Sequence, residues 1–234
     1  IFVVLGTTGA VVGLVCLLRL PETLPTRGAT ESPASLRDGL TAVFSHPTSL
    51  RYALSVALSS AGMFAYISAS PFVFMEVFGV PQSQFGYYFA LTATALLAGA
   101  TMNRSLVRRH IPSHTLLRMG TGIVAAAGAL IGLMAALKLG GLAGVIAPMM
   151  LYLFGMGLVQ PNATALAMEP HARTAGAVSS VMGGLQTLGG ALAAAIVGAF
   201  YDRSTTSMAA TVTVLALLTL VSSLSTDRAR KVLR

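Results

Sequence analysis

Four side chains spaced along one expected helix face are the first in this sequence that could do chemistry. Ser59, Met63, Tyr66 and Ser70 recur every three or four residues, which places them on one side of a helix. Two hydroxyls, a polarisable thioether and an aromatic ring together suit an amphipathic ligand. The same pattern is typical of a helix–helix interface in which hydroxyls bond across to neighbours. The bulk of Tyr66 favours a ligand-lining face.

Two amides flanking a proline form a second candidate group. Gln160 and Asn162 lie on either side of Pro161, which must interrupt any helix around it. Their amides either touch a ligand or satisfy backbone groups that the proline frees, and the sequence leaves both readings open. Pro71, which follows Ser70, makes a comparable break. We predict that the two prolines are hinges.

Glycines gather in one apolar run, at positions 183, 184, 189 and 190. Gly183, Gly184, Gly189 and Gly190 would permit a close and mobile helix crossing, which is more often structural than functional. We list them with Pro71 and Pro161 as candidate gating residues. Gln186 lies among them.

Charged groups are missing from the middle of every apolar run. Glu76 and Glu169 lie near run ends, and all four histidines fall in connections. An intramembrane serine or zinc protease needs a histidine in a span, and a retinal protein needs a lysine. We therefore expect no enzyme, no metal site and no bound cofactor. An ion-coupled carrier normally needs an embedded acid or base, so that group would lie elsewhere.

The composition indicates a membrane protein. Of 234 residues, 55% are hydrophobic and 9% are charged, and the mean hydropathy is +0.78. A soluble domain of this length has too little interior to hide so much apolar surface. The net charge of +8 does not indicate nucleic-acid binding, because the arginines lie in short connections instead of one aromatic-rich patch.

Seven apolar runs predict seven membrane-spanning helices and an all-α membrane protein. The expected spans are 1–20, 51–78, 85–106, 116–137, 142–168, 175–200 and 207–225. The connection 21–50 is either a disordered linker or contains a short amphipathic helix that starts at Ser32–Pro33 and lies on the membrane surface. The segment 51–226 would form one six-helix bundle, followed by a basic tail at 227–234.

The basic residues predict the orientation of the spans. Alternate connections hold thirteen of the fifteen lysines and arginines, whereas the opposite side has only Lys138 and Arg203. Because the side rich in lysine and arginine is usually cytoplasmic, we expect the C-terminus inside a bacterial plasma membrane.

The spans also suggest an inverted repeat. Spans two to four and five to seven start on opposite sides, and an offset of 90 residues aligns Pro71 with Pro161 and Gly86 with Gly176. Proline-interrupted segments at matching places in two halves are typical of transport sites.

Several local motifs resemble the Bcr/CflA drug-resistance transporters of the major facilitator superfamily. The motifs are Pro21–Leu24 after a span, Ser60–Ser68, Ser70–Phe74, Gly79–Pro81, Gly157–Met168, and Gly176–Ser180 with Gly183 and Gln186. This resemblance implies a twelve-span drug/proton antiporter. Such a protein needs no cofactor and uses the proton gradient as its energy source. The chain would be its sixth helix, central cytoplasmic loop and C-terminal six-helix half, with the N-terminal six-helix half as a partner.

The resemblance implies proton-coupled efflux of small amphipathic drugs, antibiotics or metabolites by alternating access. A seven-span receptor or a membrane assembly subunit is the alternative. The first residue is Ile1 and no methionine precedes it. We therefore expect that the chain starts inside a longer protein.

Overall fold

The chain forms two helical units. A computed structural model describes the backbone of residues 2–19 and 35–232, and the side chains of these residues apart from 173 and 225–232. Contacts divide the chain into Ile1–Pro33 and Ala34–Arg234. The described part of the first unit is helix α1 (Phe2–Arg19), an apolar helix without a buried residue. The predicted helix start at Ser32–Pro33 lies outside the described residues.

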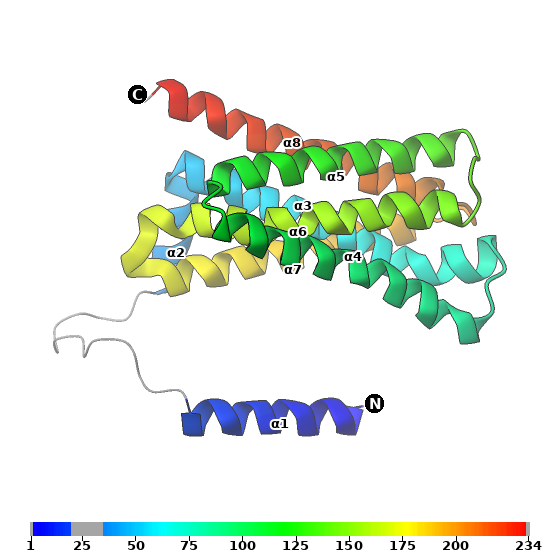
Figure 1. Cartoon of the computed structure of the whole chain (residues 1–234), viewed down its shortest axis with the longest axis horizontal. Coiled ribbons are helices and arrows are strands. Elements are labelled where there is room, and N and C mark those ends of the chain that lie inside the picture. The colour runs from blue at the N-terminus through cyan, green and yellow to red at the C-terminus, as the bar shows by residue number, and fades with distance from the viewer. Residues whose placement is uncertain (1, 20–34, 233–234) are drawn as a thin grey trace. The chain divides into compact units, whose positions relative to one another are not determined.

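The second unit contains the other helices and, in its described part, no strand. In order they are α2 (Leu36–Ser45), α3 (Pro47–Phe72), the π-helix η1 (Val73–Val77), α4 (Gln82–Arg108), α5 (Ser113–Ala136), α6 (Ala143–Met168), the 3₁₀ segment η2 (Glu169–Thr174), α7 (Ala175–Ala199) and α8 (Thr206–Val232) (Figure 1). Within the described ranges, seven helices are long and apolar enough to cross a membrane, as the sequence predicts. The helix of α8 continues to Val232, so it includes most of the predicted basic tail.

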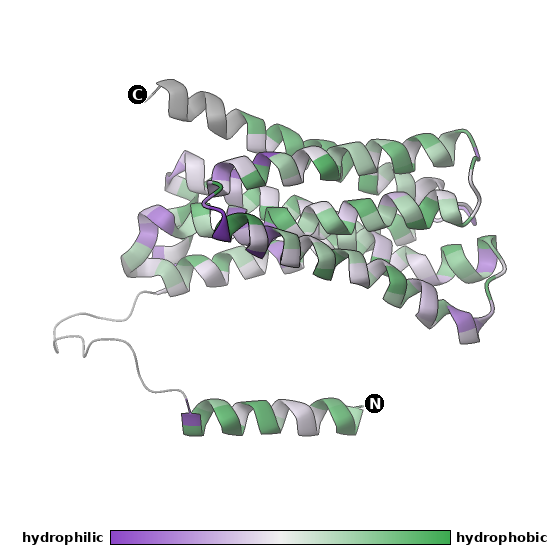
Figure 2. Ribbon diagram, in the orientation of Figure 1, coloured by the Kyte–Doolittle hydropathy of each residue, from purple (hydrophilic) through white to green (hydrophobic). Residues whose placement is uncertain are grey.

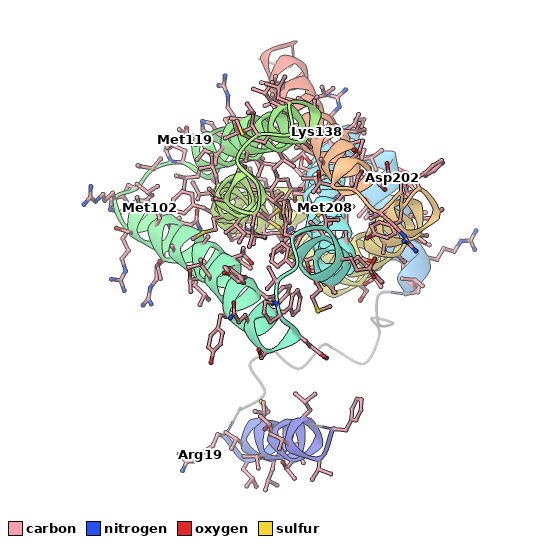
Figure 3. The ribbon with its side chains drawn as sticks, turned by 90° about the vertical axis from the view of Figure 1, so that its right-hand side faces the viewer. Arg19, Met102, Met119, Lys138, Asp202 and Met208 are labelled. Atoms are coloured by element: carbon pink, nitrogen blue, oxygen red, sulfur yellow. The ribbon has the colours of Figure 1, made fainter. Side chains whose placement is uncertain are left out.

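The helices of the second unit connect at two ends. The arginine-rich end holds the α2–α3 junction at His46, the α4–α5 connection and η2. The turn end holds the short α3–α4, α5–α6 and α7–α8 connections, on which Figure 3 labels Lys138 and Asp202. Figure 2 shows that hydrophilic residues gather near these ends, while the middle of the bundle is largely apolar.

Helix pairing follows the pattern that an inverted repeat predicts. Helix α3 packs on α7 and α8, and α6 packs in the same way on α4 and α5. We call the packed groups α3 with α7 and α8, and α6 with α4 and α5, the two triplets. The two triplets contact each other through α3 with α6 and through α5 with α8. Exchanging α3–α5 with α6–α8 therefore reproduces the observed pairs. Helices α3 and α6, which contain Pro71 and Pro161, are consequently the most buried spans.

Glycines allow the closest of these crossings. A Cβ on Gly157 of α6 would lie 2.6 Å from the backbone nitrogen of Ala100 in α4, and a Cβ on Gly99 would meet the carbonyl of Phe154. Helices α5 and α8 meet at Gly132, whose Cβ would lie 2.7 Å from the Thr213 hydroxyl oxygen. Small residues let backbones approach in this way where no hydrophobic effect drives helices together.

Pro71 changes the hydrogen bonding of α3 at the turn end. Proline has no N–H, so the carbonyl of Ile67 loses its usual helical donor. The Ser70 hydroxyl donates to that carbonyl at 3.2 Å. The helix then widens into η1, where the Phe78 N–H donates to the Val73 carbonyl five residues earlier. A π-helix of this kind is a local irregularity often found at functional sites.

Helix α2 is amphipathic and begins with a complete capping box. The Ser35 hydroxyl accepts from the Asp38 N–H, and the Asp38 carboxylate accepts from the Ser35 N–H. These Ser35 hydrogen bonds hold the pKa of Asp38 below its usual value. Gly39 and Val43 are buried, with Gly39 against α7, while Leu36, Leu40 and Phe44 are exposed as an apolar stripe. Its contact with a membrane surface stays a prediction.

The α4–α6 crossing generates a stability prediction. Gly157→Ala should lower the midpoint of thermal unfolding in detergent, because a methyl group there meets backbone on the facing helix and overpacking typically costs about 1–3 kcal/mol. Gly176→Ala is the matched control, since its Cβ would meet no atom within 4 Å. It should leave the midpoint unchanged or raise it, through better helix propensity. Equal midpoints for both variants would contradict the close crossing.

Candidate functional site

Three spans meet at a cluster of neutral polar side chains. Gln160 Nε2 of α6 donates to Ser60 Oγ of α3 at 2.7 Å. Ser60 Oγ in turn donates to Gln186 Oε1 of α7 at 3.3 Å. The same Gln160 nitrogen lies 3.3 Å from Ser59 Oγ and 3.4 Å from the Val56 carbonyl oxygen. We call Ser59, Ser60, Gln160 and Gln186 the amide cluster.

The hydrogen bonds of the amide cluster run in one direction, from α6 through α3 to α7. Gln160 is the donor at one end, and Gln186 is the acceptor at the other. Within the described part of the chain, Gln160 Oε1 and Gln186 Nε2 have no hydrogen-bond partner. Both glutamines are partly exposed. The cluster therefore offers one free acceptor and one free donor, and no charge.

Ser59 lies at the buried base of this cluster. Its side chain is fully buried and its hydroxyl donates to the Ser55 carbonyl at 2.8 Å. The Ser59 carbonyl accepts from the Tyr152 hydroxyl of α6 at 2.9 Å. This bond needs Gly62, because a Cβ there would overlap the Tyr152 hydroxyl oxygen. Tyr152 thus fixes α6 against α3 beside the amide cluster.

Tyr66 lies between α3 and α4, and 1% of it is exposed. Its ring stacks on Phe89, with centroids 6.1 Å apart and planes 5° apart. The Thr92 hydroxyl donates to the Phe89 carbonyl at 2.8 Å, so Tyr66 supplies the proton of its own 2.9 Å bond to Thr92. In this structure Tyr66 is a helix–helix contact, and its role in ligand binding stays a prediction.

Ser70 and Met63, the other members of the predicted α3 face, differ in how far they are buried. Ser70 is fully buried and bonds the Ile67 carbonyl beside Pro71. Met63 is partly exposed and packs against the apolar core. Of the four predicted residues on this face, Met63 is thus the one that is partly exposed, as are the two glutamines of the amide cluster.

Asn162 and Gln160, the two amides beside Pro161, make different contacts. Asn162 is buried, and its Nδ2 donates to Asn103 Oδ1 of α4 at 2.6 Å and to the Leu158 carbonyl at 2.7 Å. Asn162 therefore ties α6 to α4 and to its own helix. Gln160 reaches α3 instead and keeps a free oxygen, which makes it the better placed of the two for a ligand.

The four candidate gating glycines also differ. The Cβ position of Gly190 lies 2.5 Å from the Phe64 ring of α3, which makes a close contact. Gly189 would make an ordinary contact 3.5 Å from the Ala57 carbonyl oxygen, and Gly183 and Gly184 meet nothing within 4 Å. Only Gly190 is required by packing within the described residues, and a gating role for any of them stays a prediction.

An apolar cavity lies between α3, α7 and α8. It has a volume of about 600 Å³ and is lined by side chains such as Leu58, Leu188, Leu192 and Val214. Its two hydroxyls are internally bonded, since Ser207 donates to the Val197 carbonyl and Thr211 to the Ser207 carbonyl. The cavity can hold apolar groups but cannot orient a polar one. For that reason we place the candidate site at the amide cluster.

Acidic groups of the described spans lie only at helix ends. Glu76 accepts a hydrogen bond from Tyr201 at the turn end, 3.1 Å away. Among the described residues, no three histidine, cysteine or acidic side chains are placed to hold a metal ion. Of the methionines labelled in Figure 3, Met208 is buried inside the bundle, whereas Met102 and Met119 are each about half exposed.

Two residues of the cluster were not among the sequence candidates. Ser60 follows Ser59 directly, but it lies about 100° further round the helix and is the residue that joins all three spans. Gln186 is the one amide in the glycine-rich helix α7, and this isolation in an apolar run was the available signal.

A bundle of long apolar helices with polar groups gathered at its ends (Figure 2) defines a multi-pass membrane protein. The Major Facilitator Superfamily profile matches residues 1–194. The chain therefore belongs to this superfamily of membrane transporters, and the all-α fold with seven spans is confirmed.

Two relatives give a finer comparison. The chain is 30% identical over 204 residues to YdgK of Bacillus subtilis, an uncharacterized MFS-type transporter, covering 85% of this chain and 49% of the relative. It is 26% identical over 208 residues to a bicyclomycin resistance protein homolog of Haemophilus influenzae, covering 84% of this chain and 49% of the relative. The chain thus spans about half the length of these curated relatives.

Burial of Tyr66 generates a prediction about abundance. Tyr66→Ala should strongly reduce the amount of folded protein in the membrane, because emptying a buried aromatic site typically costs about 3–5 kcal/mol. Tyr66→Phe keeps the ring stack, loses the Thr92 bond, and should cost about 1 kcal/mol. Fluorescence-detected size exclusion measures both. Normal abundance of Tyr66→Ala with an altered substrate range would make Tyr66 a cavity wall after all.

Proposed function

We propose that the chain is the C-terminal half of a Bcr/CflA-type drug transporter, preceded by its sixth helix and central loop. The Gly157–Met168 and Gly176–Ser180 motifs that carry this resemblance lie in α6 and α7, which supply both glutamines of the amide cluster. Two observations support this proposal: the chain covers about half of each relative, and one of them is the bicyclomycin resistance protein homolog of Haemophilus influenzae. The partner is then an N-terminal six-helix half.

The substrate class follows from the amide cluster, which is the observation that carries the proposal. A free carbonyl oxygen on Gln160 and a free N–H on Gln186 fit a small molecule that has both a donor and an acceptor. Because the cluster has no charged group, it favours neutral molecules over ions. Met63 and the apolar surfaces of α3 and α7 suit the remainder of an amphipathic drug, antibiotic or metabolite.

Efflux is driven by proton entry in this proposal. The described spans of this chain contain no acid or base in their middle portions, so the proton-carrying group belongs to the N-terminal half. This chain, the C-terminal half, contributes substrate recognition and a movable wall. Alternating access would use the prolines, with Pro71 near the turn end and Pro161 in the portion of α6 near the arginine-rich end.

The proposed location is a bacterial plasma membrane with the arginine-rich end and the C-terminus in the cytoplasm. The described arginines of that end include Arg37, Arg51, Arg104, Arg108, Arg109 and Arg118. Among the described basic residues of the second unit, only Lys138 and Arg203 occupy the turn end. This asymmetry is the pattern that orients spans during insertion. A receptor or assembly subunit is not favoured by a match to a transporter superfamily.

The amide cluster predicts a selective loss of transport. Gln160→Leu and Gln186→Leu in the full-length protein should each raise the KM for a neutral polar drug roughly tenfold, the effect of losing one hydrogen bond worth about 1–1.5 kcal/mol. Abundance should change little, since both side chains are partly exposed. Gln84→Leu, at the start of α4, makes the same chemical change away from the cluster and should transport normally.

Uptake into inverted vesicles measures these KM values. A candidate substrate must first be found by screening antibiotics and metabolites against wild type. Unchanged KM in both cluster variants would remove the substrate role of the amides.

A proton gradient tests the coupling separately. Inverted vesicles that contain the full-length protein should accumulate substrate when the lumen is acidified, and a protonophore should abolish this accumulation. Transport that continues unchanged without any gradient would contradict proton antiport, while leaving the amide cluster as a substrate site.

A further inference from the structure

Two histidines from different connections meet at one buried serine at the arginine-rich end. His46 ends α2 and caps α3, and His171 lies in η2 between α6 and α7. The Ser49 hydroxyl oxygen lies 3.1 Å from His46 Nδ1 and 3.0 Å from His171 Nε2. Ser49 is 1% exposed, and the imidazole rings meet edge to face with centroids 5.5 Å apart. We call these three residues the histidine clasp.

The backbone fixes where the protons of the clasp lie. The Ser49 N–H donates to His46 Nδ1 at 3.3 Å, so this nitrogen must carry a lone pair and His46 must be neutral. The Ser49 hydroxyl can then bond Nδ1 only as a donor. Its oxygen is left to accept from His171, which must hold a proton on Nε2. Every bond of the clasp is satisfied by this one assignment.

We propose that His46 is a proton-binding site whose occupancy opens the clasp. A proton on Nδ1 removes the lone pair that accepts from both the Ser49 N–H and the Ser49 hydroxyl. It also places a cation at the N-terminus of α3, where the helix dipole disfavours positive charge. A second proton on His171 would put a like charge 5.5 Å from the first ring. Neutral imidazole therefore holds the clasp closed.

The direction of the pH dependence follows. The closed clasp needs an unprotonated Nδ1 on His46, so its contacts are present at alkaline pH and are lost at acidic pH, once that nitrogen takes up a proton. Among the side chains that the structure describes, the charged groups on the elements packed at the clasp are Arg37 and Asp38 of α2, Arg51 of α3 and Glu169 of η2. Arg173 of η2 and the charged residues at the end of α8 lie outside the described side chains. Asp38 is engaged with Ser35, and α7 carries no charged side chain.

Opening would act on the same three spans that form the amide cluster. The clasp joins the start of α3 to the connection between α6 and α7, and the cluster joins these helices further along. Proton binding to the clasp, at the arginine-rich end, thus loosens the contact between α3 and the α6–α7 connection. This effect on transport rests on the proposed function, whereas opening of the clasp does not.

Hydrogen–deuterium exchange of the full-length protein in lipid nanodiscs tests the clasp itself. Peptides covering residues 46–54 and 168–176 are compared at pH 8 and pH 5.5, after correction for intrinsic exchange. Both should exchange about fivefold faster at the lower pH, the effect of losing one hydrogen bond. His46→Asn should abolish this dependence in the first peptide, because an asparagine oxygen caps the helix and does not titrate in this range.

His110→Asn is the matched control. His110 has positive φ, which asparagine tolerates, and its ring makes no hydrogen bond to the described residues. It should keep the wild-type response. Ser49→Ala cuts the link to His171 and should make the 168–176 peptide exchange fast at both pH values. Wild-type exchange without pH dependence, or an unchanged dependence in His46→Asn, would overturn the proposal, whether or not transport is observed.

Discussion

Hydrocarbon offers no water to a polar group, and this absence governs how the helices of the bundle are joined. Most hydroxyls in the spans donate to carbonyls of their own helix, as Ser59 does to Ser55, Thr92 to Phe89 and Thr219 to Leu215. Such a hydroxyl has its one proton engaged within its own helix, although the Thr213 hydroxyl lies 2.7 Å from both the Ala209 carbonyl oxygen of α8 and the Gly128 carbonyl oxygen of α5. Polar contacts between spans therefore come from a few side chains that reach across, and the amide cluster is where three spans meet.

Close packing compensates for the scarcity of polar contacts. Gly157 at the α4–α6 crossing lies against the backbone of α4, and Gly132 at the α5–α8 crossing makes room for the Thr213 side chain. Gly62 instead makes room for the Tyr152 hydroxyl, which bonds a backbone carbonyl of α3. Helices α3 and α6, each central to one triplet, collect both kinds of contact. They also contain Pro71 and Pro161, which are interior prolines at matching positions, so the most buried spans are also the interrupted ones.

The sequence predicted the number and position of the spans because a run of about twenty apolar residues has few other uses. It also suggested an inverted repeat through its matching prolines, and the helix pairs agree with such a repeat. It did not predict which face of α3 meets α6 and α7. Ser59 and Ser60 are adjacent and equally polar, and a helix that is apolar on all sides has no strong direction. The choice between them depends on Gln160 and Gln186, which are at least 100 residues away in the chain.

The one-way order of hydrogen bonds in the amide cluster has a stereochemical consequence. The acceptor lies on α6, the donor lies on α7, and the serine between them belongs to α3. These three different points, together with the helix walls that hold them, form a chiral frame. A molecule bound as proposed would meet both free ends in one orientation, and its mirror image would turn its apolar part to a different wall. A wholly uncharged site can in this way distinguish enantiomers.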